Sequence, residues 1–199
     1  MKLSIAQMSK YISFVLCVIT LVMTIGCGRN APPPASPGLS LEDEASIYAA
    51  VIRQLATVDD TFGGNLEPTK LFIIKNTDDK AGDPTGPSSF STAISQTAQD
   101  KITDMLHDLS SIIVWIDKFE DAEFEEGKSP GLEKLPIQSV IDGGAIITLG
   151  NIHLQNDGSA QVAGSIYVAS LAAGGATYIL EKKEGSWEIT GTTGVRWIS

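Results

Sequence analysis

The feature that most constrains this chain is an uncharged, apolar segment near its start, residues 11–25. Lys2 and Lys10 precede it, and no charged residue interrupts the segment itself. A transmembrane helix needs about 20 apolar residues to cross a bilayer, so this segment is short for a span but has the length of a signal-peptide core. We therefore expect residues 1–26 to be a signal peptide that takes no part in the mature fold.

The end of this segment, residues 23–27, reads Met-Thr-Ile-Gly-Cys and resembles the lipobox of bacterial lipoproteins. Gly26 supplies the small residue before the cysteine, whereas Thr24 departs from the leucine that is commoner at its position. The resemblance implies cleavage between Gly26 and Cys27, diacylglyceryl transfer to the Cys27 sulfur and acylation of the new amino terminus with a fatty acid such as palmitate. A signal anchor and an ordinary signal peptide with a chance cysteine are the alternatives.

Residues 27–39 follow as a proline-rich stretch that contains Pro32, Pro33, Pro34 and Pro37. Such a sequence disfavours helix and favours extended polyproline II, which would span on the order of 35 Å. A spacer of this kind suits a domain held at a membrane, and two or more acyl chains anchor stably. We expect an exported protein whose partner is the lipid bilayer, reached through acylated Cys27, at the cell membrane or outer membrane.

The remaining segment, residues 40–199, has the composition of a single folded domain. Apolar residues make up 43% of the chain and charged residues 19%, close to globular averages. No cysteine follows Cys27, so the domain has no disulfide and no thiolate metal site. The formal net charge is −10, and because Lys2 and Lys10 lie in the signal peptide, the mature part carries about −12. This charge argues against nucleic acid as a partner.

The hydrophobic pattern predicts an α+β fold. Apolar residues recur at helical spacing after the capping residue Ser40, and again from about Ser91 to Leu109. Residues 71–74 and 112–116 are short apolar runs that we interpret as strands, the second as a buried one. We expect four β-rich stretches near residues 138–155, 160–171, 175–184 and 186–198, separated by Asn156-Asp157-Gly158, Gly174-Gly175 and Glu184-Gly185.

This pattern predicts two helices packed on a curved, mainly antiparallel sheet that ends in a four-strand meander. The order of elements, with Gly185-Ser186-Trp187 near the end, resembles the NTF2-like fold, although the second helix of that family's N-terminal pair is not evident. The block from Gly164 onward also looks like the ends of uncharacterised secreted bacterial proteins. We expect Trp187, Val195 and Trp197 to pack the last strand against a helix, with Gly185 turning the chain into it.

The residues that carry chemistry form no recognised motif. The two histidines, His107 and His153, lack a metal-binding spacing, so surface or sheet-edge roles are the simpler interpretation. The acidic residues of 117–126 and of the loop with Asp78, Asp79 and Asp83 lack the calcium-loop pattern, and we interpret both as solvated loops, without excluding calcium at 117–126.

Other candidate groups have equally plain interpretations. Asp59 and Asp60 could act as a hydrolytic carboxylate pair but also suit a helix end. No serine-hydrolase elbow or phosphate loop occurs. The tryptophans and tyrosines can line a ligand cavity in the sheet or fill its core, and we favour the core: Trp115, Tyr167, Tyr178, Trp187 and Trp197.

We therefore expect no catalytic residue, metal or cofactor, and a lipid-anchored protein of the cell envelope that acts as a non-enzymatic binding or structural module. The alternative is a small-molecule-binding or hydrolytic NTF2-like domain with a pocket inside its sheet. Inward-facing polar groups in a deep cavity would favour that alternative.

The Cys27→Ser variant tests the lipobox. We expect unprocessed precursor without lipid, because serine has no sulfur to accept the diacylglyceryl group. Mass spectrometry of the membrane fraction measures both the start of the chain and its acyl mass. A wild-type mature chain that begins elsewhere, or that lacks acyl mass, would contradict the lipoprotein interpretation.

Overall fold

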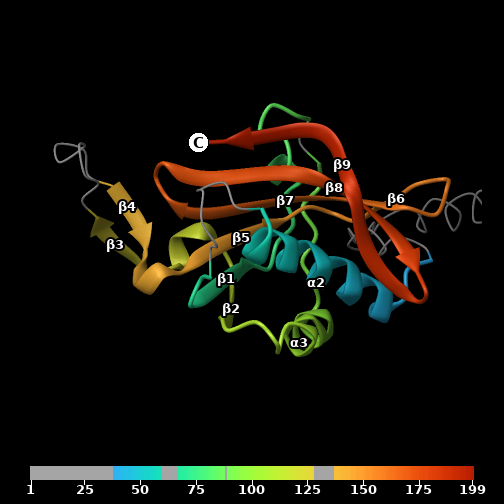
Figure 1. Ribbon diagram of the computed structural model, residues 1–199, viewed down its shortest axis with the longest axis horizontal. Coiled ribbons are helices and arrows are strands. Elements are labelled where there is room, and N and C mark those ends of the chain that lie inside the picture. Colours follow the sequence, from blue (N-terminus) through green and yellow to red (C-terminus); the bar gives the residue numbers. More distant parts are fainter. Residues whose placement is uncertain (1–37, 60–66, 88, 128–136) are drawn as a thin grey trace, which may run out of the picture. The chain divides into compact units, whose positions relative to one another are not determined.

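The computed structural model describes residues 38–59, 67–87, 89–127 and 137–199, all within one structural unit, residues 35–199 (Figure 1). The signal peptide, Gly26, Cys27 and most of the proline-rich stretch lie outside the described residues, so the lipobox stays a prediction. In the part that is described, no helix is both long enough and apolar enough to cross a membrane.

The first described helix, α2 (Leu41–Thr57), begins where its capping residue predicts. The Ser40 side chain accepts a hydrogen bond from the backbone N–H of Asp43, and three acidic residues occupy the positive first turn. The apolar face of the helix is buried, with Ile47, Val51 and Ile52 inaccessible to solvent. This face packs onto the sheet and forms the main hydrophobic core.

The second helix, α3 (Gln96–Met105), is shorter than the predicted segment of residues 91–109. It starts after Ser95, because the residues before it pair with the chain that follows β1 (Lys70–Ile74). The N–H of Ile94 donates to the carbonyl of Lys75, and the N–H of Thr77 donates to the carbonyl of Thr92. Backbone pairing therefore replaces the first predicted helical turn.

A nine-stranded mixed sheet forms the centre of the described domain. Besides β1, its strands are β2 (Ile112–Ile116), β3 (Phe124–Gly127), β4 (Ile137–Val140), β5 (Ala145–Leu149), β6 (His153–Leu154), β7 (Ala160–Ala169), β8 (Ala172–Lys183) and β9 (Ser186–Ile198). Strand β1 runs parallel to β2 and β5, and the other described pairings are antiparallel. Strands β5, β7, β8 and β9 are neighbours in that order and form the predicted four-strand meander.

Two details of the strand predictions were wrong. Strand β2 is an edge strand and not a buried one, since it pairs only with β1 among the described strands and Ile112 is 64% exposed. The chain turns between β7 and β8 near Leu171, whereas Gly174 and Gly175 lie inside β8. The turn at Glu184 and Gly185, both with positive φ, is where the sequence predicts it.

The two faces of the sheet carry different layers. On one face, α2 packs against alternate residues of β7 such as Val162 and Ile166, and α3 packs against α2 (Figure 1). On the other face, a smaller apolar cluster forms around Phe72, Ile146 and Val140, under the segment that links β2 to β4. Further along this second face, a short 3-10 helix, η1 (Asp79–Ala81), contacts β7 and β8.

The last strand confirms part of its prediction. Trp187 is buried at 8% exposure and donates its indole hydrogen bond to Asp43 of α2. Trp197 is half-buried and donates to the carbonyl of Ala81, so it packs against the 3-10 helix η1 and not against α2 or α3. Val195 is 45% exposed, and its expected core role was wrong. Irregular pairing around Gly191 and Gly194 shifts the register of β9 and turns Val195 outward.

The close contact between η1 and β8 requires a residue without a side chain at position 175. A Cβ on Gly175 would lie 2.6 Å from Nε1 of Trp197, 2.8 Å from the carbonyl oxygen of Gly164 and closer still to the carbonyl oxygen of Ala81. Two of these three atoms belong to the backbone and cannot rotate away.

We therefore expect Gly175→Ala to destabilise the full chain by about 1–3 kcal/mol, as overpacking typically does. Gly191→Ala is the matched control in β9, because a Cβ there meets no atom within 4 Å. Urea denaturation in detergent measures both variants. Equal stabilities for the two variants would show that η1 does not pack on Gly175.

Candidate functional site

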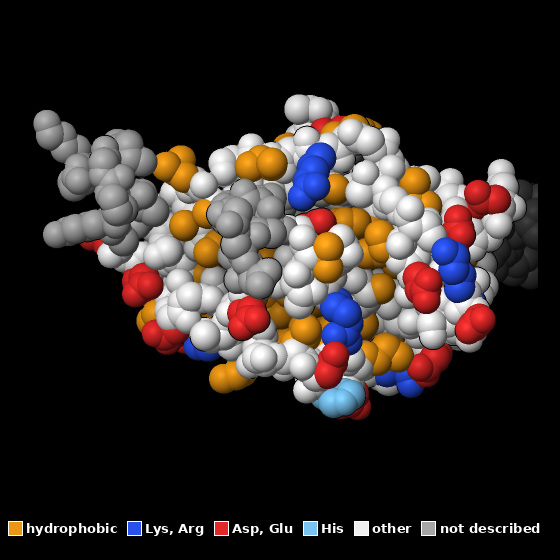
Figure 2. Space-filling view, in the orientation of Figure 1, with side chains coloured by type: hydrophobic (Ala, Val, Ile, Leu, Met, Phe, Trp, Pro, Cys, Tyr) orange, Lys and Arg blue, Asp and Glu red, His pale blue; other side chains and the backbone are white. Residues whose placement is uncertain are grey.

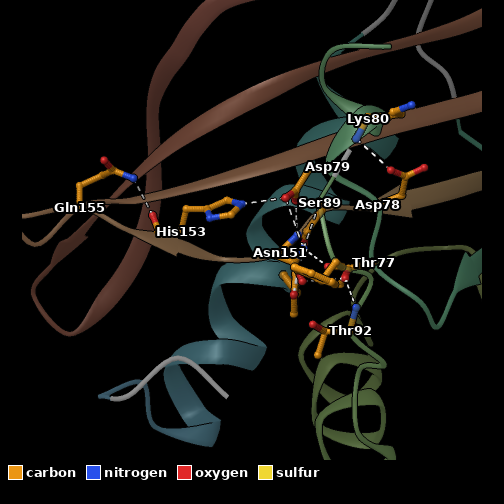
Figure 3. A network of polar contacts seen from close by, with 12 residues as sticks. Thr77, Asp78, Asp79, Lys80, Ser89, Thr92, Asn151, His153 and Gln155 are labelled. Carbon is orange, nitrogen blue, oxygen red and sulfur yellow. Dashed lines mark hydrogen bonds and ion pairs between the residues drawn. The ribbon is translucent and has the colours of Figure 1, made fainter. Parts of the chain in front are cut away.

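The candidate site is built where η1 meets the chain between β5 and β6, and Asp79 is its centre (Figure 3). The preceding residues hold the segment in place. The buried Thr77 donates its hydroxyl hydrogen bond to Oδ1 of Asn151 at 2.8 Å and accepts one from the N–H of Thr92 at 2.8 Å. The N–H of Asp78 donates to the carbonyl of Leu149 at 2.7 Å. These contacts leave Asp79 facing Asn151 and His153.

The Asp79 carboxylate accepts hydrogen bonds from several residues at once. The backbone N–H of Asn151 donates to Oδ1 at 2.6 Å, and the side-chain amide of Asn151 donates to Oδ2 at 3.3 Å. Nε2 of His153 lies 2.9 Å from the same Oδ2 atom. Burial acts to raise the pKa of Asp79, but hydrogen bonds from Ser89, His153 and Asn151 outweigh it and hold that pKa below its ordinary value.

Gly150 allows this approach. A Cβ at position 150 would lie 2.6 Å from Oδ1 of Asp79 and 2.7 Å from the methyl group of Ala163. The N–H of Gly150 donates to the carbonyl of Ala163 at 2.7 Å, which keeps the chain beside β7 through the break between β5 and β6. The break therefore leads the chain past Asp79 and then returns it to the sheet at His153.

His153 and Asp79 form part of the wall of a pocket of about 340 Å³ on the face of the sheet opposite the two helices. Its floor comes from β7 and β8, where Gln161, Ala163 and Thr177 alternate with residues that face the helices. The side chains that bring polar groups to it are those of Asp79, Asp83, Ser89, His153, Gln161 and Thr177. The volume is within the usual range for small-molecule sites.

Several of these polar groups have no partner within the described residues. They are Nδ1 of His153, the amide of Gln161 and the hydroxyl of Thr177. When the neutral imidazole of His153 donates its Nε2 proton to Asp79, its Nδ1 becomes a hydrogen-bond acceptor. The pocket therefore offers an oriented imidazole, an amide and a hydroxyl to a ligand.

The two histidines, which the sequence analysis considered as a possible pair, contact different residues. His107 follows α3, and its Nδ1 lies 2.7 Å from the carbonyl of Asp104 in the same segment. His153 contacts Asp79, which is 74 residues away in the chain. His153 therefore lies in a strand at the sheet edge, as predicted, but its contact with Asp79 was not predicted.

The acidic loop, residues 117–126, divides its carboxylates among separate partners. Asp117 pairs with Lys75 at 2.9 Å, Glu123 lies 3.9 Å from Lys70, and Asp121 accepts a hydrogen bond from the N–H of Lys118. Within the ranges that the structure describes, no three histidine, cysteine or acidic residues are arranged to hold a metal ion.

Asp59 lies two residues beyond the end of α2 and forms no pair with a second described carboxylate. Asp60, the other member of the pair weighed in the sequence, lies outside the described residues. The Asp59 carboxylate accepts hydrogen bonds from the hydroxyl of Tyr178 and from the amide of Gln54. Burial, and then Asp59 itself, raise the pKa of the Tyr178 phenol. Tyr178 and Trp187 are core residues, as predicted, and Trp115 and Tyr167 pack partly buried against the two apolar clusters.

The contribution of Asp79 to stability depends on pH in a defined direction. Because the folded-state pKa of Asp79 is lowered, its stabilising contribution is fully present above the unfolded pKa, about 3.9, and is lost as pH falls through the folded pKa. We expect Asp79→Asn to cost about 1–3 kcal/mol at pH 7 and to flatten the loss of stability in acid.

Asp117→Asn is the control, because the Asp117 side chain is 75% exposed. Exposed ion pairs such as the one between Asp117 and Lys75 contribute about 0–1 kcal/mol to stability. Urea denaturation at neutral and acidic pH compares the two variants. If both variants lose the same stability at pH 7, the hydrogen bonds of Asp79 do not support the fold.

Comparisons with known proteins identify no relative of this chain. No family model matches the chain, and neither a curated protein nor a solved structure matches it. The likeness to the NTF2-like fold and to lipoproteins therefore stays a prediction from the sequence.

Proposed function

We propose that this chain is a lipid-anchored protein of the cell envelope whose folded domain binds a small ligand and catalyses no reaction. Gly26-Cys27 and the proline-rich stretch support the anchor, with the acylated Cys27 at the cell membrane or, in a two-membrane cell, the outer membrane. Gly28 supports that sorting, since it is not the aspartate that retains lipoproteins in the inner membrane. The single observation that supports ligand binding is the pocket lined by Asp79 and His153, in which the Asp79 carboxylate holds the imidazole of His153 in place.

The arrangement of the pocket favours binding over hydrolysis. In a serine hydrolase, histidine lies between the serine and the carboxylate. Here Ser89 shares the Asp79 carboxylate with His153, and the amide of Asn151 also donates to the Ser89 hydroxyl at 3.4 Å. Among the described residues, therefore, no hydroxyl is bonded to the free nitrogen of His153.

The alternative, a hydrolytic domain with its pocket inside the sheet, has less support. The aromatic residues that would line such a cavity, Tyr178 and Trp187, are buried in the core between the sheet and α2. Figure 2 shows acidic side chains spread over the visible face with only isolated lysines and arginines, a surface that would repel the phosphates of a nucleic acid.

Thermal melting of the full chain in detergent, with three chemically different probes, tests ligand binding. The probes are a neutral sugar such as galactose, the diamine putrescine and the anion glucose 6-phosphate. We expect at least one of them to raise the melting temperature, because a ligand that binds only the folded state stabilises it.

The expected rise is lost in Gln161→Leu and Thr177→Val, whose polar groups have no other described partner, and it is retained in His107→Gln. A rise that persists in both pocket variants, or no rise with any probe, contradicts a binding role for this pocket. Neither result bears on Cys27, so the anchor and the pocket are tested separately.

A further inference from the structure

The pocket carries negative charge and lacks a cationic residue. None of the residues that line it is lysine or arginine, whereas Asp79 and Asp83 both contribute carboxylates. Hydrogen bonds from Thr85 lower the pKa of Asp83, and those described above lower the pKa of Asp79, so both are ionised at neutral pH. An anionic ligand would therefore be repelled, and the acidity of the whole chain adds to that repulsion.

The unpartnered groups match a ligand that both donates and accepts hydrogen bonds. In the neutral imidazole whose Nε2 donates to Asp79, Nδ1 of His153 is an acceptor, while the amide of Gln161 and the hydroxyl of Thr177 each provide donors and acceptors. A single ammonium group only donates, and would leave the amide donors of Gln161 unpaired. A compound with several hydroxyl groups satisfies all three.

Apolar surface beside these groups suits the carbon–hydrogen faces of such a compound. Ala163 and Pro87 also line the pocket. Phe90 is 88% exposed and follows Ser89 by one residue, and its carbonyl accepts a hydrogen bond from the Asn151 amide at 2.8 Å. The backbone that carries this exposed ring is thus tied to the residue that also binds Asp79.

We infer that the ligand of this pocket is a neutral polyhydroxylated compound, such as a sugar, held by Gln161, Thr177 and the free nitrogen of His153. This inference rests on the proposed binding function and names its ligand class.

The two histidines make the test selective, because the whole chain contains only His107 and His153. The full chain is labelled with ¹⁵N and ¹³C at histidine, purified in detergent and titrated separately with galactose, putrescine and glucose 6-phosphate. We expect galactose to shift the imidazole signals of His153 saturably while those of His107 stay in place. His107→Gln assigns the two sets of signals.

Gln161→Leu is expected to weaken galactose binding about fivefold or more, since it removes hydrogen bonds to the sugar. Gln155→Leu is the matched control, because its amide donates to the backbone carbonyl of His153 and does not line the pocket. If putrescine or glucose 6-phosphate shifts His153 and galactose does not, the pocket binds a ligand but the sugar class is wrong. If none of the three probes shifts His153, the binding function fails together with this inference.

Discussion

The Asp79 carboxylate is the interaction on which the candidate site depends. It is only 17% exposed, and hydrogen bonds reach it from two separate parts of the chain, from Ser89 and from the neighbouring residues Asn151 and His153. A partly buried carboxylate is stable only when such donors compensate for its lost hydration. The same bonds fasten the segment around η1 to the sheet, so one group both stabilises this face and orients His153.

The backbone around Asp79 is shaped by residues that have no side chain. At Gly150 a methyl group would collide with the carboxylate, and at Gly175 it would collide with the carbonyl of Ala81. Trp197 completes this contact from β9 by donating to that carbonyl at 2.8 Å. The end of the chain, η1 and the middle of the sheet therefore form one packed region beside the pocket.

The sequence was most informative where structure depends on local pattern. The Ser40 cap and the apolar spacing after it identified α2, and the Glu184-Gly185 turn identified the hairpin of β8 and β9. Predictions went wrong where distant contacts decide. Gly174-Gly175 looks like a turn, but Gly175 is needed for packing against a segment more than 90 residues earlier. The pairing of His153 with Asp79 likewise has no local signal, since neither residue lies in a spaced motif.

In the proposed site, Asp79 holds His153 with its proton on Nε2 and its Nδ1 free. Nitrogen NMR of the labelled imidazoles in alkaline buffer, where imidazole is neutral, measures this tautomer directly for both histidines. We expect His153 to carry its proton on Nε2 and to lose that preference in Asp79→Ala, while His107 is unchanged. A proton on Nδ1 of His153 in the unaltered chain, or the same His153 tautomer in the unaltered chain and in Asp79→Ala, would contradict the central role given to this carboxylate.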